Sequence, residues 1–195
     1  MPVDLVKGQR ISLEKEAGGS LSRVVMGLGW DVAQPRGLRK MFGGGGGESI
    51  DLDASCVMFD GAGQPVDTIY YSQLRSKDGS IVHTGDNLTG EGEGDDEQII
   101  VDLTRVPQNV EALMFVVNSF TGQDFSRIEN AFCRIVDEGT GTEVARYELS
   151  GGGNHNAQVM AKLYRQGGEW KMHAIGENTS GRTFRDLMPA MTANL

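Results

Sequence analysis

The residues with the clearest potential for chemistry lie in one acidic, glycine-rich stretch between positions 83 and 97. Its carboxylates occur without a lysine or arginine among them: Asp86, Glu91, Glu93, Asp95, Asp96 and Glu97. Calcium takes roughly six to eight oxygen ligands from carboxylates, amides and backbone carbonyls, and the alternating glycines let backbone carbonyls turn inward. We therefore expect a calcium site whose side-chain oxygens come from Asp86, Asn87, Asp95, Asp96 and Glu97.

Other interpretations of this stretch fit less well. It has the length of an EF-hand loop, but Leu88 and Gly90 stand where oxygen ligands are required and Glu91 stands where glycine is required. A phosphate-binding glycine loop would need a following lysine, and glutamates would repel the phosphate. Zinc is disfavoured because the histidines are scattered along the chain, whereas magnesium and a solvated acidic loop that binds nothing stay open as alternatives.

Further carboxylates come from two strand-like segments. Asp31 follows an apolar run that ends at Trp30, and Asp51 and Asp53 share one face of an alternating segment with Ser55. Two neighbouring carboxylates on one strand face repel each other unless a cation lies between them. We therefore add Asp51 and Asp53 to the candidate metal ligands, whereas Asp31 at the end of its strand is by itself equally typical of a turn.

The elements that must position these residues are predicted to be almost entirely strands. Apolar residues repeat with a period of two, and single glycines separate short apolar runs. Strands are expected at 9–13, 22–30, 50–60, 68–71, 80–83, 98–103, 112–118, 130–137, 143–149, 158–165 and 170–175. This spacing predicts a single all-β domain over residues 1–195, an antiparallel two-sheet sandwich with a short C-terminal helix at about 180–188. Residues 34–49, with the run Gly43–Gly47, are expected to form a flexible loop.

Composition narrows the functional classes. A formal net charge of −9 disfavours direct nucleic-acid binding. Cys56 and Cys133 lie in apolar runs and are expected to be core residues, not a disulfide framework. Neither a signal peptide nor a membrane span is predicted, so a reducing cytoplasm fits best. The local context of the Ser, Cys and His residues suggests no nucleophile with its base, so we expect a protein that is not an enzyme.

Several segments together resemble the TerD-type tellurium-resistance and stress-response proteins. The similarity rests on Gly27–Asp31 (GLGWD), Asp51–Ser55 (DLDAS) and Thr84–Asn87 (TGDN) with Gly94–Glu97 (GDDE), and on later segments around Tyr147, Tyr164 and Trp170. It covers nearly the whole chain. The segment 34–49, which carries Arg36, Arg39 and Lys40, is longer and more basic than the family pattern and leaves partner contacts there in doubt.

The resemblance implies a β-sandwich that binds Ca²⁺, with two ions expected, at loops on one edge. It also implies a bacterial cytoplasmic protein, peripheral at the inner membrane, that works in assemblies with other proteins of a tellurite and chemical-stress resistance system. The matching positions for the ions are Asp31, Asp51, Asp53, Asp86, Asn87, Asp95, Asp96 and Glu97. A metal-dependent hydrolase that acts on a phosphate ester at the same acidic cluster is the alternative function.

Overall fold

The structure is a computed structural model, and it describes residues 2–32, 51–85, 94–149 and 153–195. The whole of the expected glycine-rich loop 34–49, and the candidate ligands Asp86 and Asn87, therefore lie outside the described residues.

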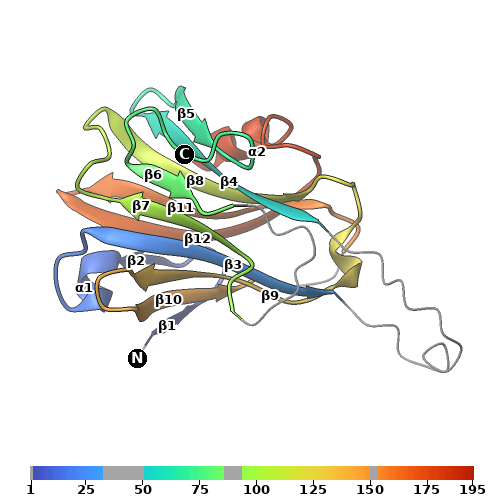
Figure 1. Ribbon diagram of the computed structural model, residues 1–195, viewed down its shortest axis with the longest axis horizontal. Helices are drawn as coiled ribbons and strands as arrows, with labels where there is room; N and C mark the ends of the chain where they lie inside the picture. Colours follow the sequence, from blue (N-terminus) through green and yellow to red (C-terminus); the bar gives the residue numbers. More distant parts are fainter. Residues whose placement is uncertain (1, 33–50, 86–93, 150–152) are drawn as a thin grey trace, which may run out of the picture.

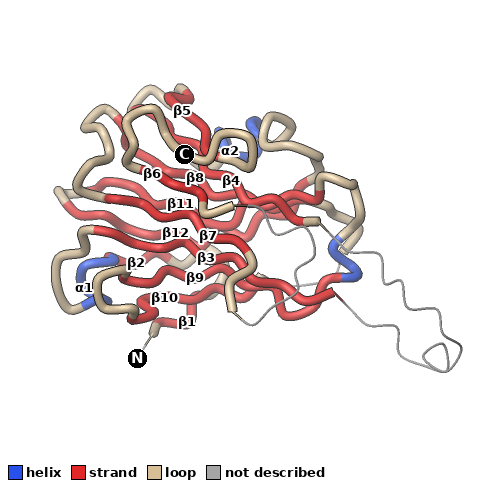
Figure 2. The backbone as a smooth tube through the Cα atoms, viewed as in Figure 1, coloured by secondary structure: helices blue, strands red, loops and turns tan. Residues whose placement is uncertain are grey.

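Two six-stranded sheets make up the described part of the chain, as Figures 1 and 2 show. Sheet A has the order β1-β10-β9-β3-β7-β6, and sheet B has the order β2-β12-β11-β8-β4-β5. Neighbouring strands are antiparallel except for β1 and β10, which pair in parallel. The predicted two-sheet, antiparallel-rich sandwich is confirmed.

The strands of sheet A are β1 (Val3–Leu5), β3 (Arg23–Val32), β6 (Ile81–His83), β7 (Glu97–Asp102), β9 (Ile128–Asp137) and β10 (Thr142–Glu148). Those of sheet B are β2 (Arg10–Ser12), β4 (Leu52–Asp60), β5 (Pro65–Ile69), β8 (Val110–Ser119), β11 (Ala157–Gln166) and β12 (Glu169–Thr179). The helices are α1 (Leu13–Ala17), the short 3-10 helix η2 (Phe125–Arg127) and α2 (Met188–Ala193).

The main core lies between the two sheets and follows the period-two pattern. In β7 the buried residues Glu97, Ile99 and Val101 alternate with partly exposed ones, as expected for a strand with one face on a core. Strand β4 is different, because both of its faces are buried. Leu52, Ala54, Cys56 and Met58 face the main core, as the alternation predicted.

A second, smaller apolar cluster covers the outer face of sheet B. Val57 and Phe59 of β4 pack there with Leu187 and Met191 of the C-terminal segment. Figure 1 shows α2 beside β4 and β8. This cluster explains why the second face of β4 is not exposed to solvent.

The C-terminal helix exists, but its predicted bounds of about 180–188 were wrong. The helix α2 begins at Met188 with Pro189 in its first turn, where a missing N–H costs nothing. Residues 182–187 instead form turns, in which the Asp186 carboxylate accepts the backbone N–H groups of Arg182 and Thr183. The proline therefore marks the start of the helix, not its end.

Two short elements near the N-terminus were missed. Strand β1 has only three residues, which is too short for an alternating pattern to reveal it. The helix α1 starts at the Ser12 N-cap and stops at Gly18, whose φ of 73° is left-handed. The β11–β12 hairpin, by contrast, has its tight turn at Gly167 and Gly168 as predicted.

Both cysteines are free and fully enclosed in the main core. Burial raises the pKa of the Cys56 thiol far above its ordinary value and raises the pKa of Cys133 to about 12. Their interpretation as small core residues is confirmed.

Candidate metal site

One end of the sandwich gathers six of the predicted ligands, and we call this group the acidic end: Asp31, Asp51, Asp53, Asp95, Asp96 and Glu97. Strand β3 ends, and strands β4 and β9 begin, at this end of the molecule, on the right in Figure 1. Because the carboxylates come from the ends of strands in both sheets, the fold brings together residues that are far apart in sequence.

Asp96 is held against β3 by backbone hydrogen bonds. Its carboxylate accepts the Trp30 N–H at 2.8 Å, and its own N–H donates to the Leu28 carbonyl at 2.8 Å. Burial, together with the negative charges of Asp31 and Asp95, raises the pKa of Asp96, although the Trp30 hydrogen bond acts in the opposite direction. The carboxylates of Asp31 and Asp95 thus lie near enough to Asp96 for their negative charges to disfavour its ionisation.

Two glycines in β3 make room for this arrangement. A Cβ atom at Gly27 would lie 2.2 Å from the Asp95 carboxylate, and one at Gly29 would lie 2.7 Å from the Gly94 carbonyl oxygen and 2.5 Å from the Phe132 ring. Any side chain at these two positions would collide with the segment that enters β7. The spacing of the glycines in the sequence motif therefore has a steric cause.

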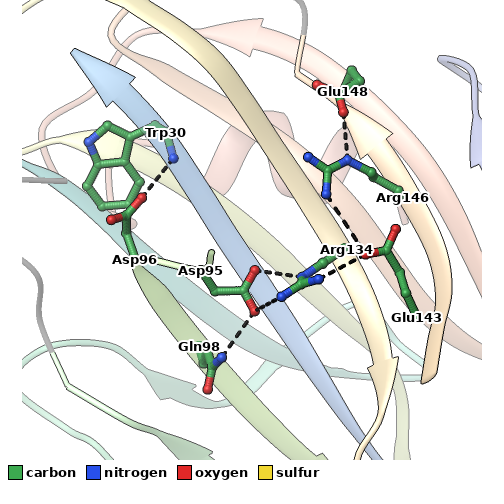
Figure 3. Close-up of polar contacts among 8 residues, drawn as sticks. All are labelled: Trp30, Asp95, Asp96, Gln98, Arg134, Glu143, Arg146 and Glu148. Carbon is green, nitrogen blue, oxygen red and sulfur yellow. Dashed lines mark hydrogen bonds and ion pairs between the residues drawn. The ribbon is translucent and has the colours of Figure 1, made fainter. Parts of the chain in front are cut away.

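Asp95 itself faces a cation on the outer face of sheet A (Figure 3). Arg134 of β9 donates from Nε at 2.7 Å and from Nη2 at 3.2 Å to the two carboxylate oxygens, and Gln98 donates at 3.1 Å. Arg134 also pairs with Glu143 at 2.9 Å, and its hydrogen bonds with Asp95 and Glu143 raise the pKa of Arg134. The Asp95 side chain is only 1% exposed, so this bidentate pair fixes the start of β7.

Asp31 meets β9 at a bulge. The register shifts between Gly29 and Asp31 where β3 pairs with β9, and Asn130 there has a φ of 52°. The Asn130 amide donates to the Asp31 carboxylate at 2.8 Å. The bulge thus turns an amide toward an exposed carboxylate at the end of β3.

Glu97 connects the two sheets. Although it lies in β7 of sheet A, its carboxylate accepts the Ala54 N–H of β4 in sheet B at 2.7 Å. His83 Nδ1 accepts the Gly85 N–H, and its Nε2 lies 3.5 Å from the Glu97 carboxylate. Glu97 is 1% exposed, so a buried carboxylate links β7 of sheet A to β4 of sheet B.

Asp51 and Asp53 occupy the start of β4. Asp53 is buried, and the Asn118 amide donates to its carboxylate at 3.4 Å and to the Arg182 carbonyl at 2.8 Å. Together with Ser55, Asp53 and Asn118 line a small cleft beneath the C-terminal segment. Asp51 lies just outside β4 and is partly buried. Asp53 thus shares one strand face with Ser55, as the alternation predicted.

The donor set at the acidic end fits a hard cation, because every contributing side-chain atom is an oxygen. No three His, Cys, Asp or Glu side chains in the described ranges are arranged closely enough to hold a metal ion by themselves. The residues that sequence reasoning missed are His83, Arg134 and Asn130, which support the carboxylates. Of these three residues, only Arg134 could have been found from the sequence, because it is a single cation inside an apolar, strand-like run.

The fold and the site define a β-sandwich protein that gathers carboxylates at one end. A family model for the TerD domain matches residues 1–189. The chain therefore belongs to the TerD family, whose members are named for tellurium resistance and stress response.

Two relatives are similar in sequence to this chain along nearly their whole length. The chain is 52% identical over 187 residues to the tellurium resistance protein TerZ of Serratia marcescens, covering 95% of this chain and 94% of that protein. It is 44% identical to the stress response protein SCP2 of Bacillus subtilis, covering 96% and 98%. A crystal structure of a TerD homologue from Streptomyces coelicolor shares the fold, with a TM-score of 0.69 at 18% identity over 89% of this chain and 98% of that one.

In the described part of the chain, no helix has the length and apolar character needed to cross a membrane.

Proposed function

We propose that this protein is a non-enzymatic, single-domain calcium-binding module of a bacterial tellurite and chemical-stress resistance system. The observation that carries the proposal is the convergence of carboxylates at the acidic end, where burial and the charges of Asp31 and Asp95 raise the pKa of Asp96. A bound cation would remove that repulsion. The names of the relatives support the role in stress resistance.

Two ions are proposed at the acidic end, with side-chain ligands drawn from Asp31, Asp51, Asp53, Asp96 and Glu97. Asp86 and Asn87, outside the described residues, are proposed to complete these ligand sets. Asp95 is assigned a supporting role, since Arg134 already engages both of its oxygens. When bound, calcium would supply charge neutralisation at this end of the sandwich.

The contacts of the described nucleophiles support a role other than catalysis. Both thiols are enclosed in the core, and His83 is directed toward Glu97 instead of toward a hydroxyl or thiol. Neutralising the acidic end would let it dock another protein of the resistance system or the anionic inner-membrane surface. The hydrolase alternative predicts turnover of a phosphate ester with calcium or magnesium, whereas we expect none.

The proposal is tested by thermal unfolding of metal-stripped protein in chelator, in calcium and in magnesium. A ligand at a hundredfold above its dissociation constant adds about 2.7 kcal/mol, which is a rise of several degrees for a domain of this size. The double variant Asp31→Asn with Asp96→Asn should lose much of the calcium response.

The matched control is Glu111→Gln, an exposed charge change near the start of β8. It should keep the full calcium response. Titration calorimetry then counts the ions. An unfolding temperature that calcium does not move would refute calcium binding and leave the family fold without this function.

A further inference from the structure

Three basic side chains lie at paired positions across neighbouring strands of sheet B. Arg10 of β2 is paired with His173 of β12, and His173 is paired with Lys162 of β11. Their neighbours Ile11, Met172 and Leu163 belong to the main core. Because strand residues alternate between faces, these three point to the outer face, and we call them the basic row.

The charges of the basic row are not balanced within it. Like charges directly opposite each other destabilise a sheet. Burial, reinforced by the nearby Arg10 charge, lowers the pKa of Lys162 and of His173. Lys162 is only 8% exposed, and neither Arg10 nor Lys162 forms an ion pair with an acid in the described residues. The nearest acids on β12 have other partners, since Glu169 accepts from Ser12 and Glu177 accepts from Asn194.

The basic row also retains unused hydrogen-bond donors. Lys162 Nζ donates to the Asn194 carbonyl at 2.6 Å, which uses one of the three donors of an ammonium group. His173 Nδ1 is buried without a hydrogen-bond partner in the described part of the chain. The Arg10 guanidinium is exposed and carries five N–H donors. The three side chains therefore bring donors from three neighbouring strands to one face of sheet B.

We propose that the basic row binds a small oxyanion of the phosphate, sulfate or tellurite type. Such an anion can accept hydrogen bonds from an arginine, a histidine and a lysine together, and charge-assisted contacts of this kind are the strong ones. In a chain with a net charge of −9, Arg10 and Lys162, which face no acid in the described residues, form a region that can attract an anion. The site is separate from the acidic end and does not depend on calcium.

The experiment measures oxyanion binding to the full chain in the presence of chelator and in the absence of thiol reductants. Inorganic phosphate, sulfate and tellurite are titrated separately at constant ionic strength, with chloride as the reference, and binding is followed by calorimetry and thermal unfolding. At least one oxyanion should bind more tightly than chloride. Arg10→Gln and His173→Gln should each weaken that binding about tenfold.

Lys15→Gln is the matched control, because it removes one positive charge from the exposed face of α1. It should leave the affinity unchanged. Co-sedimentation with vesicles that carry phosphate headgroups distinguishes the source of the anion, since binding lost in the Arg10 variant would assign the site to a lipid phosphate.

Two results would overturn the proposal: no response to any oxyanion or vesicle beyond that to chloride, or equal weakening by the Lys15 control. Arg10 is exposed and makes no core contact, so its variant should fold even if a change at buried Lys162 does not. Because chelator is present throughout, a lack of oxyanion binding would not bear on the calcium proposal. A lack of calcium binding would likewise not bear on the oxyanion proposal.

Discussion

The acidic end and the basic row both concentrate charge of one sign, but only the acidic end is also given compensating donors. Arg134 neutralises Asp95, and backbone N–H groups of Trp30 and Ala54 satisfy Asp96 and Glu97. In the basic row, Arg10 and Lys162 face another cation and no acid in the described residues. The comparison teaches that the fold holds its clustered carboxylates with donors, whereas buried Lys162 of the basic row has a backbone carbonyl as its hydrogen-bond partner.

The largest expected effect comes from removing the buried link between the sheets. Glu97→Ala leaves the Ala54 N–H without its acceptor and opens a cavity, so the free energy of unfolding should fall by about 3–4 kcal/mol. Urea unfolding in chelator measures this loss without a metal contribution. Glu97→Gln keeps an acceptor and should lose clearly less, while equal losses would contradict the proposed link.

A smaller loss is expected at the glycine that admits Asp95. In Gly27→Ala, the new Cβ would collide with the carboxylate, and overpacking of this kind costs about 1–3 kcal/mol. The matched control is Gly19→Ala, where no atom lies within 4 Å of the new Cβ. If the control proved equally destabilising in urea unfolding, the steric account of the motif would be wrong.

Asp67 provides a reference carboxylate outside both charged regions. Burial opposes its ionisation, but hydrogen bonds from the Lys77 N–H, the Gln73 amide and the Thr68 N–H, with the Lys77 charge, lower the pKa of Asp67. The stability that the ionised Asp67 contributes to the folded state should be fully present above its unfolded pKa of about 3.9. That stability should be lost as the pH falls through the lower pKa of Asp67 in the folded state.

The free energy of unfolding, measured at neutral and at acid pH, tests this direction of the pH dependence. Asp67→Asn should lose about 1–2 kcal/mol at neutral pH, and the difference from the unmodified protein should shrink on acidification. A difference that grows toward acid pH would reverse the assignment.

The smallest expected effect is a gain in stability instead of a loss. Arg10→Gln relieves like-charge repulsion in the basic row, so the anion-free protein should gain roughly 0.2–0.5 kcal/mol. High salt should reduce this gain because the charge is exposed. Thermal unfolding with and without salt tests it, and a loss of stability at low salt would mean that Arg10 is already balanced.

Much of the fold could be predicted because alternation is a local signal. Most strands, the β11–β12 turn and the two enclosed cysteines followed from patterns a few residues long. The three-residue β1 carried too little pattern, and α2 was misplaced because the stretch 180–188 was interpreted as helical, whereas the helix begins only at Met188. The local pattern thus identified most strands. It did not identify elements that are too short to show more than one helical turn or one apolar–polar alternation.

The candidate site was predictable in part for the same reason. Asp95, Asp96 and Glu97 are adjacent in sequence, and the family resemblance added Asp31, whereas ligation by any of them stays a prediction. Arg134 lies 39 residues from its partner Asp95, and only the register of the sheets brings them together. The basic row joins positions 10, 162 and 173, so no stretch of sequence could have revealed it.

The enclosure of both sulfhydryls has a consequence for how the chain reacts with oxidants. The reactive form of a cysteine is its thiolate, and the raised pKa values of Cys56 and Cys133 suppress that form at neutral pH. An oxidant can then reach either sulfur only when the sandwich opens, so the rate of thiol modification should report unfolding and not surface chemistry. The two thiols are therefore protected from modification for as long as the chain stays folded.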